Sequence, residues 1–149
     1  MSDLTMNNTR GYLAEFLVAR ALGLNDVRRI EWEAYDLEFD GITIEVKSTA
    51  PLQAWPQAGY SRQVFSGLRT GPRGARTLNA AVYVFCAQTA LKHSDYEPLD
   101  LSQWEVHVLS RRALEDAAVD SIGLTAVRAL SGGATPWSEI RRAVVDAAQ

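Results

Sequence analysis

Three charged residues, Asp36, Glu45 and Lys47, have types and a spacing that could serve metal chemistry. Eight residues separate the aspartate from the glutamate, and one separates the glutamate from the lysine. Two carboxylates supply the oxygen ligands that a hard divalent cation such as Mg²⁺ prefers. A nearby lysine could stabilise the negative charge that develops on a phosphate while it is displaced. These groups can act together only if the backbone brings them to one face.

The backbone between them predicts a β-hairpin. Asp40 and Gly41 signal a two-residue turn, because a type I′ turn needs positive φ at both central residues. The arms, residues 35–39 and 42–47, alternate apolar and polar side chains. Alternation of this kind places one face of the hairpin on the core and the other toward solvent.

Counting outward from the turn pairs Asp36 with Glu45, with Cβ atoms about 5 Å apart. Lys47 then lies on the same polar face. Two carboxylates so placed destabilise the hairpin unless a cation compensates them, and this favours a divalent metal site. The backbone carbonyl of Val46 could add another oxygen ligand. The alternative is an exposed hairpin face with an incidental Glu-Lys pair.

The motif resembles that of the PD-(D/E)XK nucleases, the restriction-endonuclease-like superfamily. Asp36 and Glu45 match its acidic ligands, and Lys47 matches its catalytic lysine. Glu15 falls where many members carry a glutamate on their first helix. The resemblance covers roughly residues 10–87 and is nearest to the small Holliday-junction-resolvase-like and Mrr-like branches.

The resemblance implies an enzyme, a Mg²⁺- or Mn²⁺-dependent nuclease that hydrolyses phosphodiester bonds in DNA. Glu15 would then join the metal or catalytic residues. Tyr35 stands where the motif nominally has a proline, which many members also lack. A nuclease-fold subunit that binds DNA or assembles without turnover is the alternative, and a structural interaction domain is a third.

The hydrophobic pattern predicts an α/β (α+β) fold with a mixed central β-sheet and flanking helices. The expected strands cover residues 27–33, 35–39, 42–47, 80–87 and 104–109, and the expected helices cover residues 8–22, 61–68, 111–119 and 136–145. This agrees with the α-β-β-β-α-β order of the restriction-endonuclease-like core. We expect a single nuclease-like domain over residues 1–149, with its core at about 8–119 and a C-terminal helical part at about 120–149.

A basic segment follows the hairpin. Residues 46–94 contain no Asp or Glu, although the whole chain has a net charge of -3. Basic patches typify nucleic-acid binding, Trp55 could stack on a base, and some members of the family place a glutamine after the lysine strand. The predicted nucleic-acid contacts are Gln53, Trp55, Arg62, Arg69, Arg73 and Arg76. A solvated basic loop is the alternative.

The composition predicts a soluble globular protein, with 47% hydrophobic and 22% charged residues. No apolar run approaches the roughly 20 residues that span a bilayer, and the first four residues lack the features of a signal peptide. The single cysteine, Cys86, excludes a disulfide within the chain and a thiolate zinc cluster. We expect a cytoplasmic protein whose partner is DNA, with homodimer formation as a further expectation and no membrane. Neither His93 nor His107 is assigned to the site, and His107 is expected to face outward.

Overall fold

Four strands form a mixed sheet at the centre of the fold. The computed structural model describes residues 7–24, 35–53 and 55–149, so the strand predicted over residues 27–33 lies outside them. The strands lie in the order β1-β2-β4-β5. Their bounds are β1 Leu37–Phe39, β2 Ile42–Thr49, β4 Val82–Gln88 and β5 Trp104–Ser110. The pair β2/β4 is parallel and the other two pairs are antiparallel, which confirms the predicted mixed sheet with flanking helices.

The predicted turn between β1 and β2 is confirmed. Asp40 and Gly41 have φ values of 49° and 79°, the left-handed conformation that a type I′ turn requires. Phe39 pairs with Ile42, and Leu37 pairs with Ile44, as counting from the turn predicts. The register of the hairpin therefore follows from its turn residues.

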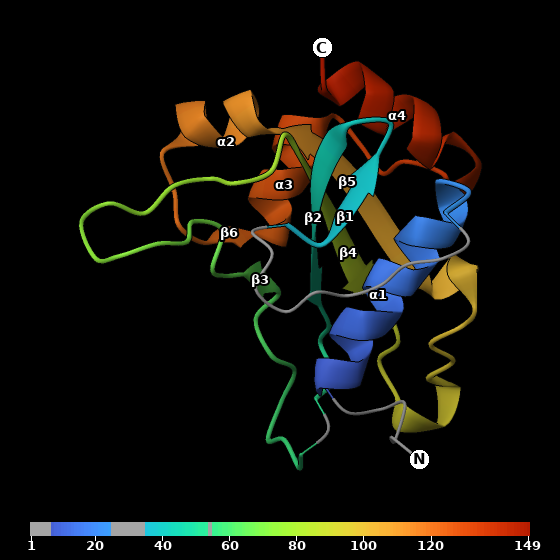
Figure 1. Ribbon diagram of the computed structural model, residues 1–149. Coiled ribbons are helices and arrows are strands. Elements are labelled where there is room, and N and C mark those ends of the chain that lie inside the picture. Colours follow the sequence, from blue (N-terminus) through green and yellow to red (C-terminus); the bar gives the residue numbers. More distant parts are fainter. Residues whose placement is uncertain (1–6, 25–34, 54) are drawn as a thin grey trace.

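One face of the sheet is covered by two helices from opposite ends of the chain. They are α1 Asn7–Ala21 and α4 Ile140–Ala147, which lie on the same side of the sheet in Figure 1. Val18 of α1, Ile44 of β2 and Val144 of α4 are fully buried in one core cluster. The apolar arm of the hairpin thus belongs to the core beneath α1.

A second core cluster fills the opposite face. A small antiparallel sheet, β3 Val64–Phe65 with β6 Ile122–Gly123, packs there beside α2 Arg111–Ala117 and α3 Leu124–Ser131. Phe65 meets Phe85 of β4 edge to face, with ring centroids 4.9 Å apart. The described residues also form three short 3₁₀ helices, η1 His93–Asp95, η2 Leu101–Gln103 and η3 Trp137–Glu139.

The helix predicted over residues 61–68 is wrong, because this segment forms β3 instead. Val64 pairs with Gly123, and the buried ring of Phe65 anchors the strand on the sheet. Gly67 has a φ of 65°, which a helix does not allow. The described residues between β2 and β4 contain no helix, so they do not reproduce the expected α-β-β-β-α-β order.

The C-terminal helices differ in detail from the prediction. The helix expected from Pro136 begins as the 3₁₀ turn η3 and continues as α4. Helix α2 ends at Ala117 because Ala118 adopts the left-handed conformation, with a φ of 55°. None of the helices in the described part of the chain combines the length and the hydropathy needed to span a bilayer.

Candidate metal and nucleic-acid site

Strand β2 presents Glu45 and Lys47 on the face of the sheet away from α1. Its neighbours in sequence, Ile44 and Val46, point the other way into the core beneath α1. Glu45 lies beside the buried Tyr83 in the parallel register with β4. The two charged side chains therefore lie on the face that β3 and β6 cover.

Glu45 and Lys47 form an ion pair. Lys47 Nζ lies 3.4 Å from Glu45 Oε1, and the two side chains retain 21% and 20% of their exposure. The same Nζ donates a hydrogen bond of 3.0 Å to the carbonyl oxygen of Gly67, just after β3. Lys47 is thus held between a carboxylate of its own strand and the loop that crosses the site.

Asp36 is fixed against β2 by two hydrogen bonds. Its backbone N–H donates to Ile44 O at 3.0 Å, and its Oδ2 accepts the N–H of Val46 at 2.8 Å. The regular cross-strand register ends at Leu37, one residue short of Asp36. The carboxylate nevertheless lies close enough to Glu45 for its charge to act on it.

The carboxyl of Glu45 is poorly compensated. Its pKa is raised from the usual 4.5 to about 7, mainly by burial and next by the charge of Asp36. Lys47 opposes this rise through its charge and its hydrogen bond, and Glu15 adds the smallest contribution. A cation placed among these groups would relieve the repulsion, because an opposite charge favours the ionised carboxylate.

The structure brings Asp36, Glu45 and Lys47 together, but Glu15 does not join them in a cluster. It lies on α1, which packs on the opposite face of the sheet, although its charge still reaches Glu45. Among the described residues, no three side chains of His, Cys, Asp or Glu are arranged to hold a metal ion. Two carboxylates still suit Mg²⁺, which usually keeps several waters and takes only one or two carboxylates from a protein.

Two of the predicted nucleic-acid arginines have structural partners. Arg69 donates from Nε to Val119 O at 3.3 Å and from its backbone N–H to Asp120 Oδ1 at 3.1 Å. Arg76 lies 3.4 Å from Asp120 Oδ2. These contacts tie the loop after β3 to the segment before β6, so the two arginines are less available to phosphate than the sequence predicts.

The other two predicted arginines, Arg62 and Arg73, are exposed on the surface. Within the described parts of the chain we find no hydrogen bond or ion pair from either guanidinium. Gln53 is engaged in its own loop, where Nε2 donates to Ala50 O at 3.2 Å. Trp55 is exposed in the same loop. Their roles in nucleic-acid binding stay predictions.

The sequence reasoning missed two features of the site and its surroundings. The first is the Gly67 carbonyl, which a sequence pattern cannot reveal because every residue carries one. The second concerns His107, whose predicted outward position is wrong: its side chain retains 1% of its exposure. It lies between Ser131 Oγ, 2.7 Å from Nδ1, and Glu105 Oε2, 2.6 Å from Nε2. No local pattern reveals this burial, because Ser131 belongs to α3, which is distant in the sequence.

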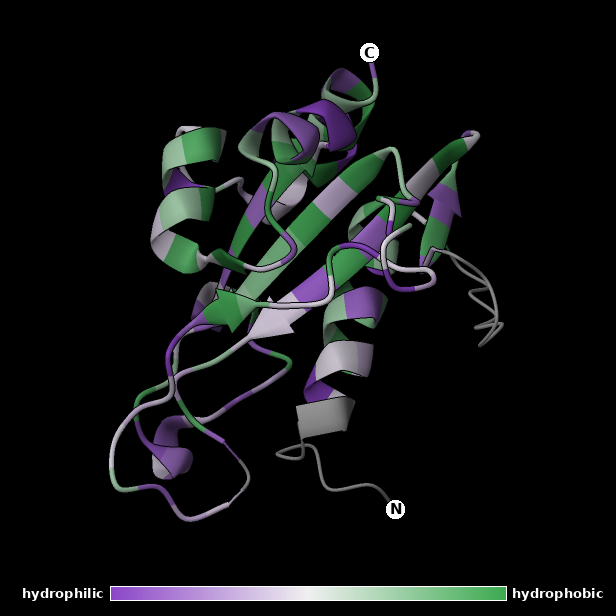
Figure 2. Ribbon diagram, turned by 90° about the vertical axis from the view of Figure 1, so that its left-hand side faces the viewer, coloured by the Kyte–Doolittle hydropathy of each residue, from purple (hydrophilic) through white to green (hydrophobic). Residues whose placement is uncertain are grey.

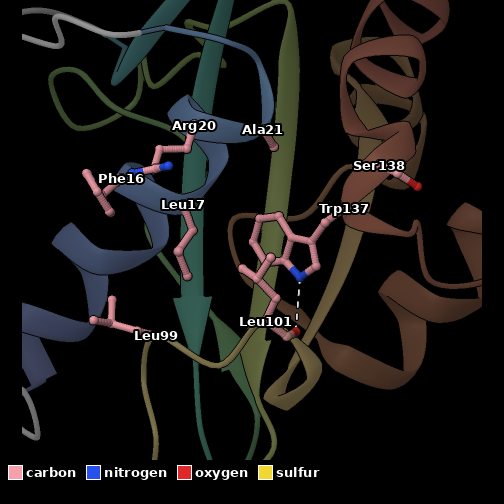
Figure 3. A pocket seen from close by; sticks show the side chains of 8 residues that line it. All are labelled: Phe16, Leu17, Arg20, Ala21, Leu99, Leu101, Trp137 and Ser138. Atoms are coloured by element: carbon pink, nitrogen blue, oxygen red, sulfur yellow. Dashed lines mark hydrogen bonds between the residues drawn. The ribbon is translucent and has the colours of Figure 1, made fainter.

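An apolar pocket lies on the α1 side of the sheet and contains none of the predicted site residues. It has a volume of about 530 Å³ and is bounded by Phe16, Leu17, Leu99, Leu101 and Trp137 (Figure 3). Trp137 Nε1 donates to Leu101 O at 3.1 Å across its edge. Its lining is mostly apolar, with the Arg20 guanidinium 5.7 Å from the centre of the Phe16 ring, and it offers no carboxylate to a metal ion.

Comparison with protein-family models finds no matching family, and comparisons with curated proteins and with solved structures find no match. The functional interpretation therefore rests on the residues of this chain and their geometry.

Proposed function

We propose that this protein is a Mg²⁺-dependent nuclease that hydrolyses phosphodiester bonds in DNA, built on a restriction-endonuclease-like core. The observation that carries the proposal is that Asp36, Glu45 and Lys47 lie beside one another. Glu45 and Lys47 belong to β2, and Asp36 directly precedes β1. The basic segment that follows β2 supports a polyanionic substrate. Homodimer formation stays a prediction of the resemblance.

Each residue of the site would have a separate role in catalysis. Asp36 and Glu45 would hold Mg²⁺ or Mn²⁺, with the Val46 carbonyl as a further oxygen ligand. The bound cation supplies Lewis-acid stabilisation of the phosphate and a lower pKa for the attacking water. Lys47 would leave the Gly67 carbonyl and donate to a phosphate oxygen as negative charge develops there. Glu15 would orient water from the α1 side.

The direct test is a cleavage screen on single-stranded, duplex and branched DNA with Mg²⁺, Mn²⁺ or EDTA. We expect cleavage that requires the metal and falls on the order of 10²- to 10³-fold in Lys47→Ala, because a positioned cation near the developing charge is lost. Arg142→Ala is the matched control, since Arg142 is an exposed cation on α4. Absence of cleavage for every DNA form, together with unchanged metal binding in Asp36→Ala, would overturn the proposal.

A second candidate is a DNA-binding or assembly subunit of the same fold without turnover. The observation that favours it is that Lys47 and Asp36 already have partners, Gly67 O and the Val46 N–H. DNA binding that persists in Glu45→Ala, without turnover by the wild-type protein under any metal condition, would select this candidate.

A further inference from the structure

We propose that the pocket between Trp55, Tyr60 and His93 binds an unpaired nucleobase, so that the substrate of the candidate site is nucleic acid with a single-stranded region. This inference rests on the proposed function for its substrate, and it adds a binding site and a strand preference. The pocket contains none of the proposed metal ligands, so it can be tested without catalysis.

The pocket lies between two loops that are distant in sequence. It has a volume of about 370 Å³, and its lining includes Leu52, Trp55, Pro56, Gln57, Tyr60 and His93. These loops follow β2 and β4, whose parallel carboxyl ends meet at one end of the sheet in both views (Figures 1 and 2). Lys47 lies on β2 only five residues before Leu52. An extended chain of that length spans at most about 18 Å, so one bound strand could reach both.

Two aromatic rings of the pocket are largely exposed. Trp55 retains 57% and Tyr60 retains 61% of its exposure. Tyr60 is also fixed in place, because its hydroxyl donates to Leu91 O in the other loop at 3.1 Å. A largely exposed ring that is held in place by its hydroxyl is pre-organised for stacking, which lowers the entropic cost of binding.

The loop that carries these rings is pinned by its own side chains. Gln57 Nε2 donates to Pro51 O at 3.2 Å and to Ser61 Oγ at 3.0 Å, and its Oε1 accepts the Gln53 N–H at 2.9 Å. The Ser61 N–H closes the loop onto Pro51 O at 3.0 Å. These bonds fix Gln57 and Ser61, the residues on either side of Tyr60 in this loop.

The charges close in sequence to the pocket favour an anionic ligand. No acidic residue occurs from position 46 to 94, and Arg62 and Lys92 are exposed close in sequence to the lining residues. Asp95 is the first acidic residue after this stretch, and it does not line the pocket. A flat aromatic body joined to a negative charge is the chemistry of a nucleotide. A neutral or acidic peptide would fit the rings but gain less from the charges.

Two polar side chains of the pocket already have partners within the protein, which favours stacking over reading of the base edge. The Gln57 amide and the Tyr60 hydroxyl, which could read the edge of a base, are already bonded within the protein. Stacking on aromatic rings is tolerant of sequence, since every base has a π-face. In a duplex both faces of a base are covered by its neighbours, so the pocket would accept only an unpaired base.

The test is fluorescence anisotropy of a labelled oligothymidine and of a blunt duplex, both in EDTA at low salt. We expect the single strand to bind the wild-type protein at least tenfold more tightly than the duplex. Trp55→Ala and Tyr60→Ala should each weaken the single strand roughly 5- to 150-fold, the range expected for one lost base stack. Tyr60→Phe keeps the ring and should retain most of the affinity.

Phe16→Ala is the matched control, because Phe16 is also a half-exposed aromatic residue but lines the other pocket (Figure 3). Its affinity should equal that of the wild type. Equal affinities for the single strand and the duplex would overturn the inference, and so would an unchanged single-strand affinity in both Trp55→Ala and Tyr60→Ala. Binding of peptides but of neither nucleic acid would overturn it as well. Cleavage measured separately with Mg²⁺ distinguishes the two failures: turnover without single-strand preference removes only this inference, and stacking without turnover removes only the proposed function.

Discussion

Two glutamates of the same sheet, Glu45 on β2 and Glu105 on β5, differ sharply in their electrostatics. Both side chains retain 20% of their exposure. The pKa of Glu45 is raised to about 7, first by burial and then by the charge of Asp36. The pKa of Glu105 is lowered to about 2, first by hydrogen bonds from Arg128 and despite burial.

The difference lies in their partners. Arg128 donates two hydrogen bonds to Glu105, from Nε to Oε2 at 2.6 Å and from Nη2 to Oε1 at 2.7 Å. His107 Nε2 adds a third contact, 2.6 Å from Oε2. Among the residues that the structure describes, Glu45 pairs only with Lys47, whose Nζ lies 3.4 Å away and also bonds Gly67 O. A network satisfied within the protein stabilises the fold, whereas a carboxylate left near a like charge is typical of a site that awaits a ligand.

The largest effect expected from this contrast is on turnover. Glu45→Gln should reduce metal-dependent DNA cleavage on the order of 10³-fold, because it removes a charged ligand of the cation. Glu105→Gln should leave kcat within a fewfold of wild type, since Glu105 belongs to the link between β5 and α3. Single-turnover cleavage of both variants measures this. Equal losses in both would remove the distinction between the two glutamates.

The second effect is on stability at pH 8, where replacing the two glutamates by glutamine should change the free energy of unfolding in opposite directions. A pKa raised from 4.5 to about 7 corresponds to about 3 kcal/mol of strain in the ionised form. Glu45→Gln should therefore raise the free energy of unfolding by about 1 to 3 kcal/mol without metal. Glu105→Gln should lower it by about 1 to 2 kcal/mol, because bonds from Arg128 and His107 weaken. Denaturant unfolding in EDTA tests both, and destabilisation by Glu45→Gln would contradict the account.

The third effect is a difference in pH dependence. Between pH 4.5 and about 7 the folded protein binds more protons at Glu45 than the unfolded chain, so this glutamate costs stability as the pH rises. The gain in Glu45→Gln should thus disappear below pH 4.5. Glu105 behaves in the opposite way: its stabilisation is complete above pH 4.5 and is lost as the pH falls toward about 2. Thermal unfolding across this pH range measures the stability difference between the wild type and each variant. Differences that do not change with pH would contradict the opposite pKa shifts of the two glutamates.

The smallest effect concerns the loop that holds Lys47. Asp120 accepts the Arg69 N–H and pairs with Arg76, and its backbone oxygen accepts the Leu68 N–H at 3.1 Å. Asp120→Asn should cost about 0.5 to 1 kcal/mol, because the contacts are exposed and the backbone bond stays. Denaturant unfolding measures the cost, and turnover should change little. A cost above about 3 kcal/mol would mean that the loop is more tightly coupled to the core than its exposed contacts imply.

The sequence predicted the hairpin and its polar face because local chemistry determines both. The turn at Asp40 and Gly41 sets the register, and strict alternation assigns each side chain to a face. The buried run of β4 was predictable for the same reason, since a short apolar run of that length suits a central strand.

The remainder depended on contacts between distant segments. Residues 61–68 have no local pattern that reveals pairing with Gly123, so β3 was mistaken for a helix. His107 was placed outside because nothing local shows that α3 covers its face of the strand. The partner of Lys47 is a backbone carbonyl, which no sequence pattern marks. The contacts of Arg69 with Val119 and of Arg76 with Asp120 join distant segments, so they too are visible only in the folded chain.

The central claim is that Asp36 and Glu45 form a cation site, and calorimetric titration with Mn²⁺ tests it most directly. We expect the wild-type protein and Glu105→Gln to bind the ion equally, and Glu45→Gln to bind it at least tenfold more weakly. Binding to the wild type at pH 7 should also release protons, because a carboxyl with a pKa of about 7 must ionise to act as a ligand. Equal affinity in wild type and Glu45→Gln, or no binding by either, would contradict the account.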